Sequence, residues 1–231
     1  MIFLALFRRR LVAKRKKLRS VTWWLRKTGA LIKNGHFVLK SGQHSDSYAN
    51  KDALYTSTAA ISSIGKRLAN HFFNKEIGAV VGPEKGGIIL AQWVAHHLNC
   101  LYLKAKNKKR VLALYAEKDG EGFALRRGYD KLARGKKILL VEDIITTGGS
   151  IKKVVEAMRS SGGEVVAIGA ICNRGEATAE SLGVPELKTL IRLRLPIWEE
   201  KNCPKCAKGV PVNTELGHGR EYLESKKPTP Q

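Results

Sequence analysis

The sequence predicts an α/β protein with a central, mostly parallel sheet flanked by helices, a small hood before the sheet and a C-terminal arm after it. Short apolar runs of strand length alternate along the chain with segments whose apolar residues recur at helical spacing. Two of these runs, ending near Val81 and Ile145, pass directly through glycine-rich loops into helical segments. This alternation is typical of parallel strands joined by right-handed helical crossovers.

The first third of the chain is expected to form the hood and the first long helix. We predict, in chain order, a helix over 21–28 that Gly29 interrupts, a short strand over 36–40 and a helix over 56–74. The core face of the long helix is marked by Ile61, Ile64, Leu68 and Phe72. Their three- and four-residue spacing places all four on one side of the helix.

The middle of the chain is expected to alternate strands with one helix and then to open into a loop. The predicted elements are a strand over 78–81, a helix over 86–97 and strands over 100–103 and 111–115. Residues 116–135 are rich in glycine and charge, which suits a mobile loop.

The last third supplies the remaining core and the arm. We expect a strand over 138–145, a helix whose buried face carries Ile151, Val154, Val155 and Met158, and a strand over 165–172. The polar tail from Pro196 onward, with its prolines and glycines, is typical of an appended arm. The predicted organisation is a leader over 1–20, a core domain over 21–195 and an arm over 196–231.

The composition is ordinary for a globular protein except for its charge. A chain of 231 residues with 43% hydrophobic residues suits one core domain with extensions. The formal net charge of +22 favours contact with polyanions or with a polyphosphorylated substrate. Part of the excess lies in a basic stretch over 8–19. We expect the leader to be a helix, either with no assigned role or in non-specific contact with a polyanion or an anionic surface.

The sequence argues against a secreted or membrane-spanning protein. No apolar run approaches the ~20 residues that a membrane-spanning helix needs. The basic residues follow the short apolar start instead of preceding it, which is the wrong order for a signal peptide. Four cysteines show no framework of secreted disulfides. We therefore expect a cytoplasmic protein.

The run from Ile138 to Ser150 is the strongest functional signal. An apolar strand ends in two carboxylates, Glu142 and Asp143, followed by a small loop of Thr146, Thr147, Gly148, Gly149 and Ser150 that opens a helix. Backbone N–H groups and the helix dipole at such a junction favour phosphate. The loop is neither a G-x-x-x-x-G-K-[ST] nor a G-x-G-x-x-G motif. Carboxylates beside a phosphate loop suit a sugar phosphate with vicinal hydroxyls, although the two acids could instead only cap the helix.

A second strand-to-helix junction follows the strand ending near Val81. It carries Lys85 and Gly86 at the start of a helix, where backbone N–H groups and a lysine would bind pyrophosphate well. A plain structural turn is the alternative for this segment.

These two segments carry a resemblance to a known family. The stretch 142–150 resembles the phosphoribosyl pyrophosphate signature of the type I phosphoribosyltransferases, and 80–87 resembles their pyrophosphate loop. The resemblance covers roughly residues 21–195 and implies the type I phosphoribosyltransferase fold there. It also implies a pentosyltransferase, Mg²⁺ bound mainly through the substrate, an oxocarbenium-like transition state and a homodimer.

The hood segment and the strand after the motif are similar to those of orotate phosphoribosyltransferases. The segments 28–31 and 37–45 match a G-A-L and F-x-L-x-S-G pattern, in which Lys40 reaches the substrates. Tyr48 stands at an aromatic position of that family, whereas Ala49 replaces a second aromatic residue. Arg174 matches the arginine that pairs with the orotate carboxylate, and a guanidinium forks well onto a planar carboxylate.

The segment 115–122 corresponds to the catalytic lid of the family. It offers Lys118 but lacks the usual histidine and has a shorter spacing, with Arg126 and Arg127 further on. The resemblance makes Lys118, Glu142 and Asp143 the catalytic candidates. Lys118 would stabilise the leaving pyrophosphate, and the two carboxylates would hold the ribose hydroxyls.

The arm carries a weak metal signal. Cys203 and Cys206 form a C-x-x-C, and His218 follows at a distance. These are three zinc candidates where a structural site normally needs four ligands. We expect a metal-free tail, with a site completed between two chains left open. The histidines at 36, 44, 71, 96 and 97 show no ligand spacing.

The expected function is transfer of ribose 5-phosphate from phosphoribosyl pyrophosphate to orotate in pyrimidine biosynthesis. Two alternatives stay open. A purine or other base-salvage phosphoribosyltransferase would share the phosphoribosyl motif but not the base-selecting residues. A nucleotide-sensing, RNA-binding regulator on the same fold would explain the basic leader.

Overall fold

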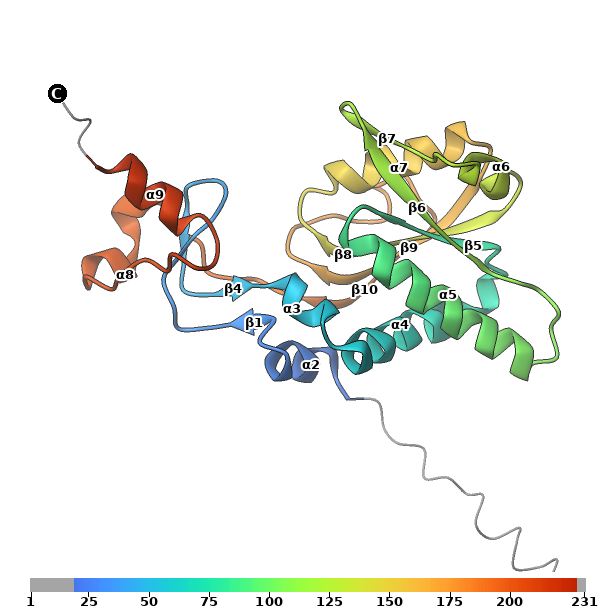
Figure 1. Ribbon diagram of the computed structural model, residues 1–231, viewed down its shortest axis with the longest axis horizontal. Helices are drawn as coiled ribbons and strands as arrows, with labels where there is room; N and C mark the ends of the chain where they lie inside the picture. The colour runs from blue at the N-terminus through green and yellow to red at the C-terminus, as the bar shows by residue number, and fades with distance from the viewer. Residues whose placement is uncertain (1–18, 228–231) are drawn as a thin grey trace, which may run out of the picture.

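The computed structural model describes residues 19–227, and a six-stranded sheet forms its centre (Figure 1). The strand order is β10-β9-β8-β5-β6-β7. All neighbours are parallel except β6 and β7, which form an antiparallel hairpin. The strands are β5 (Ala79–Pro83), β6 (Leu112–Asp119), β7 (Gly122–Ala124), β8 (Lys137–Ile145), β9 (Glu164–Asn173) and β10 (Leu187–Arg192). The α/β fold with a mostly parallel sheet that the sequence predicts is confirmed.

Helices cover both faces of this sheet and enclose two apolar cores. One core lies under α2 (Val21–Lys27), α3 (Lys51–Tyr55), α4 (Thr58–Phe72), the short η1 (Phe73–Lys75) and α5 (Gly86–Lys104). The other lies under α6 (Tyr129–Ala133) and α7 (Gly149–Ser160). The predicted core faces of α4 and α7 are buried as expected. Ser57 caps α4, since its hydroxyl accepts a hydrogen bond from Ala60 N at 3.3 Å.

The hood consists of two short antiparallel pairs that stand beside the sheet. β1 (Leu31–Ile32) pairs with β4 (Tyr48–Ala49), and β2 (Phe37–Val38) pairs with β3 (His44–Ser45). The arm follows β10 and contains η2 (Glu200–Asn202), α8 (Pro204–Ala207) and α9 (Gly219–Ser225). Figure 1 shows the arm, in red, lying beside the hood at one end of the molecule. Segments from the two ends of the described chain therefore form one unit.

Two expectations for the middle of the chain are wrong. Residues 100–103 are not a strand but belong to the last turns of α5. Their short apolar run continues the helical spacing of Leu90, Val94 and Leu98, and Tyr102 is buried on the same face. An apolar run of four residues does not by itself distinguish a strand from a buried helix, and here the helical neighbours decide.

The segment 116–135 is also more ordered than the sequence suggests. β6 runs on to Asp119, a turn at Gly120 leads into β7, and α6 follows. Charged residues toward the exposed end of β6 obscure the alternation that would mark a hairpin. The edge strand β10 was not predicted either, and most of its residues are only partly buried.

The predicted basic leader lies almost entirely outside the described residues. Among residues 19–227, no helix combines the length and the apolar character that crossing a bilayer requires.

Candidate active site

The two predicted loops meet at one edge of the sheet. β5 and β8 are parallel neighbours, so the junctions that follow them, into α5 and α7, lie side by side. Gly86 packs so closely on Asp143 that a Cβ at this position would overlap the Oδ2 atom of the carboxylate. Only glycine leaves room for this approach, which brings the expected pyrophosphate loop against the expected ribose-binding carboxylates.

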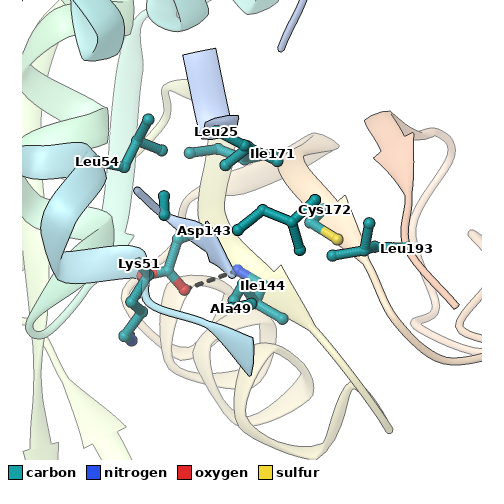
Figure 2. Close-up of a pocket in the computed structure, with 11 residues that line it drawn as sticks. Leu25, Ala49, Lys51, Leu54, Asp143, Ile144, Ile171, Cys172 and Leu193 are labelled. Atoms are coloured by element: carbon teal, nitrogen blue, oxygen red, sulfur yellow. Dashed lines mark hydrogen bonds and ion pairs between the residues drawn. The ribbon is translucent and has the colours of Figure 1, made fainter. Parts of the chain in front are cut away.

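Asp143 is a buried carboxylate with three polar contacts. It is only 3% exposed, and its Oδ1 accepts a hydrogen bond from Ile144 N at 2.7 Å. Its Oδ2 accepts one from Tyr55 Oη at 3.2 Å and lies 3.1 Å from Lys51 Nζ. Figure 2 shows this carboxylate between Lys51 and the backbone of Ile144. The contacts hold the side chain in a fixed direction at the end of β8.

A small apolar pocket lies behind this carboxylate. Its lining includes Leu25, Leu54, Ile171, Cys172 and Leu193, and its volume of about 30 Å³ has room for one water molecule but not for a nucleobase (Figure 2). The pocket is therefore a small gap in the apolar packing behind Asp143. Burial in this packing raises the pKa of the Cys172 thiol to about 11, which keeps this cysteine neutral and unreactive.

Burial and the charge of Asp143 shift the pKa values of three neighbouring side chains. Burial, followed by repulsion from Asp143, raises the pKa of Glu142 to about 8. Burial lowers the pKa of Lys51, but the attraction and hydrogen bond of Asp143 outweigh it, so this pKa is raised overall. Burial and the same carboxylate also raise the pKa of Tyr55. These shifts favour a charged lysine, a neutral phenol and the protonated form of Glu142.

The loop after β8 forms a cradle of phosphate size. A cavity of about 50 Å³ is lined by Glu142 and by Ile144, Ile145, Thr146, Thr147, Gly148, Gly149, Ser150 and Ile151. The hydroxyl-bearing residues of this loop are exposed, and the loop ends at the N-terminus of the twelve-residue α7. Backbone N–H groups at the start of a helix, hydroxyl donors and the helix dipole would together favour an anion at this position.

The β6–β7 hairpin brings the backbone of Lys118 to the second junction. Glu84 accepts a hydrogen bond from Lys118 N at 2.9 Å and donates its own N–H to Ala116 O at 3.0 Å. Lys85 follows at the start of α5, and both lysine side chains are exposed. Two cations therefore border the loop where pyrophosphate is expected.

A large cavity of about 980 Å³ joins the hood, the cradle and the end of β9. Its lining includes Lys40, Tyr48, Thr146, Thr147 and Arg174. Arg174 N donates to Ile145 O at 2.8 Å, which fixes the backbone that carries this arginine beside the phosphate loop. Within residues 19–227, neither the Arg174 nor the Lys40 side chain forms an ion pair, so both cations are available to an anionic ligand.

The structure therefore gathers most of the predicted site residues in two regions. One is the cradle after β8 with the large cavity beside it, and the other is the junction between β5 and α5. It also adds Lys51 and Tyr55, which the sequence analysis missed. Their partner Asp143 lies 88 residues beyond Tyr55, and no local pattern marks either residue. Only the packing of α3 against the end of β8 reveals them.

The zinc candidates separate from each other in the structure. His218 borders the large cavity, and its Nδ1 lies 3.7 Å from Glu221 Oε1. Cys203 and Cys206 instead lie with two hood histidines, His36 and His44. His218, a weak zinc candidate in the sequence, therefore lies outside the group that the two cysteines form with the hood histidines.

Comparisons with known proteins agree with this geometry. Residues 50–186 match the family model described as the phosphoribosyl transferase domain. The orotate phosphoribosyltransferase of Caldanaerobacter subterraneus subsp. tengcongensis is 37% identical over 182 residues, covering 79% of this chain and 88% of the relative. That of Thermotoga maritima is 38% identical over 195 residues, covering 84% and 96%.

Solved structures share the fold. The crystal structure of orotate phosphoribosyltransferase from Aeropyrum pernix has a TM-score of 0.59 at 27% identity, covering 75% of this chain and 93% of that one. A Mycobacterium tuberculosis orotate phosphoribosyltransferase structure reaches the same TM-score at 22% identity, covering 75% and 95%.

Proposed function

This chain belongs to the phosphoribosyltransferase family, and on this premise we propose that it transfers ribose 5-phosphate from phosphoribosyl pyrophosphate to orotate. The products are orotidine 5′-monophosphate and pyrophosphate, in a step of pyrimidine biosynthesis. One observation carries the proposal: Arg174 and Lys40 face the same cavity as Thr146 and Thr147 of the phosphate loop. A cavity that joins a phosphate cradle to two cations suits an anionic base next to a ribose phosphate.

The cradle after β8 binds the ribose phosphate in this proposal. The amides and hydroxyls of residues 146–150 hold the 5′-phosphate at the N-terminus of α7. Glu142 and Asp143 accept hydrogen bonds from the ribose hydroxyls, which requires Glu142 to be ionised. Lys51 and Tyr55 keep the Asp143 carboxylate in place.

The second junction binds the leaving group. Lys85 and the first amides of α5, including that of Gly86, bind the pyrophosphate. Lys118 lies next to this loop and offsets the negative charge that develops as the bond to the anomeric carbon breaks. The hairpin that carries Lys118 also limits the access of water to the reacting carbon.

The base occupies the large cavity. The Arg174 guanidinium pairs with the orotate carboxylate, and Lys40 reaches the substrates from the hood. Tyr48 lines this cavity, and its ring is held there by stacking on Phe37 with a centroid distance of 5.4 Å. Together these residues orient the base nitrogen toward the ribose bound in the cradle.

The donor set around the cradle fits Mg²⁺. The oxygens available from the protein are the carboxylates of Glu142 and Asp143, and Mg²⁺ prefers oxygen ligands while it keeps several waters. Substrate diphosphate oxygens would supply most of the remaining ligands. A bound Mg²⁺ would offset the charge of the diphosphate. A homodimer and a cytoplasmic location remain predictions.

A turnover assay tests the proposal. Pyrophosphate release is followed with phosphoribosyl pyrophosphate and Mg²⁺ in the presence of orotate, uracil, adenine, guanine or hypoxanthine. We expect release with orotate alone. Release with another base would keep the transfer and change the base. Binding of phosphoribosyl pyrophosphate without release for any base would refute the enzyme and favour a regulator, whose RNA affinity should fall steeply with salt and depend on residues 8–19.

A further inference from the structure

Four potential metal ligands meet where the arm packs on the hood. The group consists of His36 and His44 from the hood and Cys203 and Cys206 from the arm, and their ligand atoms all lie within 4.8 Å of one another. His36, His44 and Cys203 are at most 3% exposed, and Cys206 is partly buried. The members come from segments more than 160 residues apart. Sequence spacing therefore showed only the C-x-x-C half of the group.

The distances within the group fit a tetrahedron. Zinc–sulfur bonds of about 2.3 Å and zinc–nitrogen bonds of about 2.0–2.1 Å give sulfur–nitrogen edges of about 3.6 Å. Cys203 Sγ and Cys206 Sγ each lie 3.6 Å from His36 Nε2, and Cys206 Sγ lies 3.3 Å from His44 Nδ1. The two nitrogens are 2.8 Å apart, and an ion between them needs about 0.5 Å more. A small rotation of either imidazole provides this.

A contact outside the group orients one of the histidines. His36 Nδ1 lies 2.7 Å from the carbonyl oxygen of Val210, which accepts a hydrogen bond from it. This bond places the proton on Nδ1, so that the lone pair of Nε2 points into the group. Metal-binding histidines typically have such a partner on the nitrogen that does not bind the metal.

From this geometry we propose that His36, His44, Cys203 and Cys206 form a zinc site. Two thiolates and two imidazoles favour Zn²⁺ over the oxygen-preferring Mg²⁺ of the proposed reaction. Four protein ligands fill a tetrahedral shell and leave no position open for a substrate, so the site is structural. It replaces the metal-free tail that the sequence predicts.

The site would fasten the arm to the hood. The hood strands β2 and β3 have two residues each, too few to be stable without support. His44 and Trp198 exchange backbone hydrogen bonds of 2.7 and 2.9 Å, and Asn213 N donates to His36 O at 2.8 Å. Zinc would add four coordinate bonds where the arm contacts the hood. Much of the free energy of zinc binding would therefore stabilise the folded arm and hood.

The site also has a consequence for the base cavity, which rests on the proposed function. The hood contributes Lys40 and Gln43 to that cavity, and the arm contributes Ile197 and His218. Because the metal joins these two walls, its loss should raise the KM for orotate by more than the KM for phosphoribosyl pyrophosphate. The phosphate cradle is built on β8 and α7 and does not depend on the arm.

Metal analysis of the full chain, purified without a histidine tag, tests the site directly. We expect about one zinc ion per chain when the metal content is measured by inductively coupled plasma mass spectrometry. Replacement of zinc by Co²⁺ should give the absorption of tetrahedral cobalt with thiolate charge-transfer bands. A chain that binds neither Zn²⁺ nor Co²⁺ after reduction of its thiols would overturn the proposal, as would octahedral cobalt without thiolate bands.

Matched variants assign the ligands. Cys206→Ser and His44→Ala should lose the metal and melt at a lower temperature, whereas Cys100→Ser and His218→Ala should keep it. Loss of metal in His218→Ala, or its retention in Cys206→Ser, would refute the assignment. If a ligand variant fails to fold, the cobalt spectrum of the unmodified chain still decides. Metal content is independent of turnover, so an absent site and an incorrect substrate give different results.

Discussion

The ion pair between Lys51 and Asp143 gives the sharpest test of the site electrostatics. We consider Lys51→Met, which keeps the aliphatic stem and removes the charge. The Asp143 side chain is 5% exposed and lies 3.1 Å from Lys51 Nζ, whose own side chain is 45% exposed. The change leaves a buried carboxylate with only Tyr55 and one backbone N–H as partners.

The expected loss lies between the values for exposed and buried pairs. Exposed pairs contribute about 0–1 kcal/mol, whereas removal of one partner from a fully buried pair costs about 3–5 kcal/mol. Because the lysine is half-exposed and the carboxylate keeps two donors, we expect a loss of about 1–2 kcal/mol in the free energy of unfolding. The control is Lys137→Met, since Lys137 lies at the same distance of 3.1 Å from Glu76, with exposures of 42% and 70%. Because Glu76 is fully solvated, this change should have little effect on the free energy of unfolding.

Urea unfolding followed by circular dichroism measures both variants. Equal losses in Lys51→Met and Lys137→Met would refute the argument that burial of Asp143 decides the effect. The pH dependence gives a second check, because the pKa of Lys51 is raised above 10.5. The stabilisation is fully present below the unfolded pKa and is lost as the pH rises through the folded pKa. The difference between the unmodified chain and Lys51→Met should therefore shrink as the solution becomes strongly alkaline.

Three further changes test the proposed substrate contacts. In steady-state assays, Arg174→Ala should raise the KM for orotate by about 10- to 100-fold, because charge-assisted hydrogen bonds are lost. The control Arg194→Ala removes an exposed arginine and should have little effect on this KM. Gly86→Ala should weaken the binding of phosphoribosyl pyrophosphate about tenfold or more, because the added methyl group displaces the Asp143 carboxylate. Calorimetry measures this affinity, and an unchanged value would contradict the close packing of Gly86 on Asp143. The kcat/KM for phosphoribosyl pyrophosphate should rise with pH through about 8, as Glu142 ionises, and a Glu142→Gln profile with the same rise would exclude this residue as its source.

The sequence alone determined the parts of this protein that depend on local pattern. The run from Ile138 to Ser150 combines a buried strand, two carboxylates and a small glycine-rich loop within one short segment, so a phosphate-binding role could be proposed for it without long-range information. The same holds for the amphipathic faces of α4 and α7, where spacing directly gives the buried side. The family membership, and with it the overall fold, also followed from these contiguous motifs.

The tertiary structure alone decided which distant residues meet. Tyr55 and Lys51 join Asp143 only because α3 packs against the end of β8, and two histidines of the hood meet the C-x-x-C only because the arm folds back onto it. The end of α5 was misread for a related reason, since a short apolar run takes its conformation from its neighbours. Contacts between residues far apart in sequence carry no periodic signal, because they arise from the packing of complete elements.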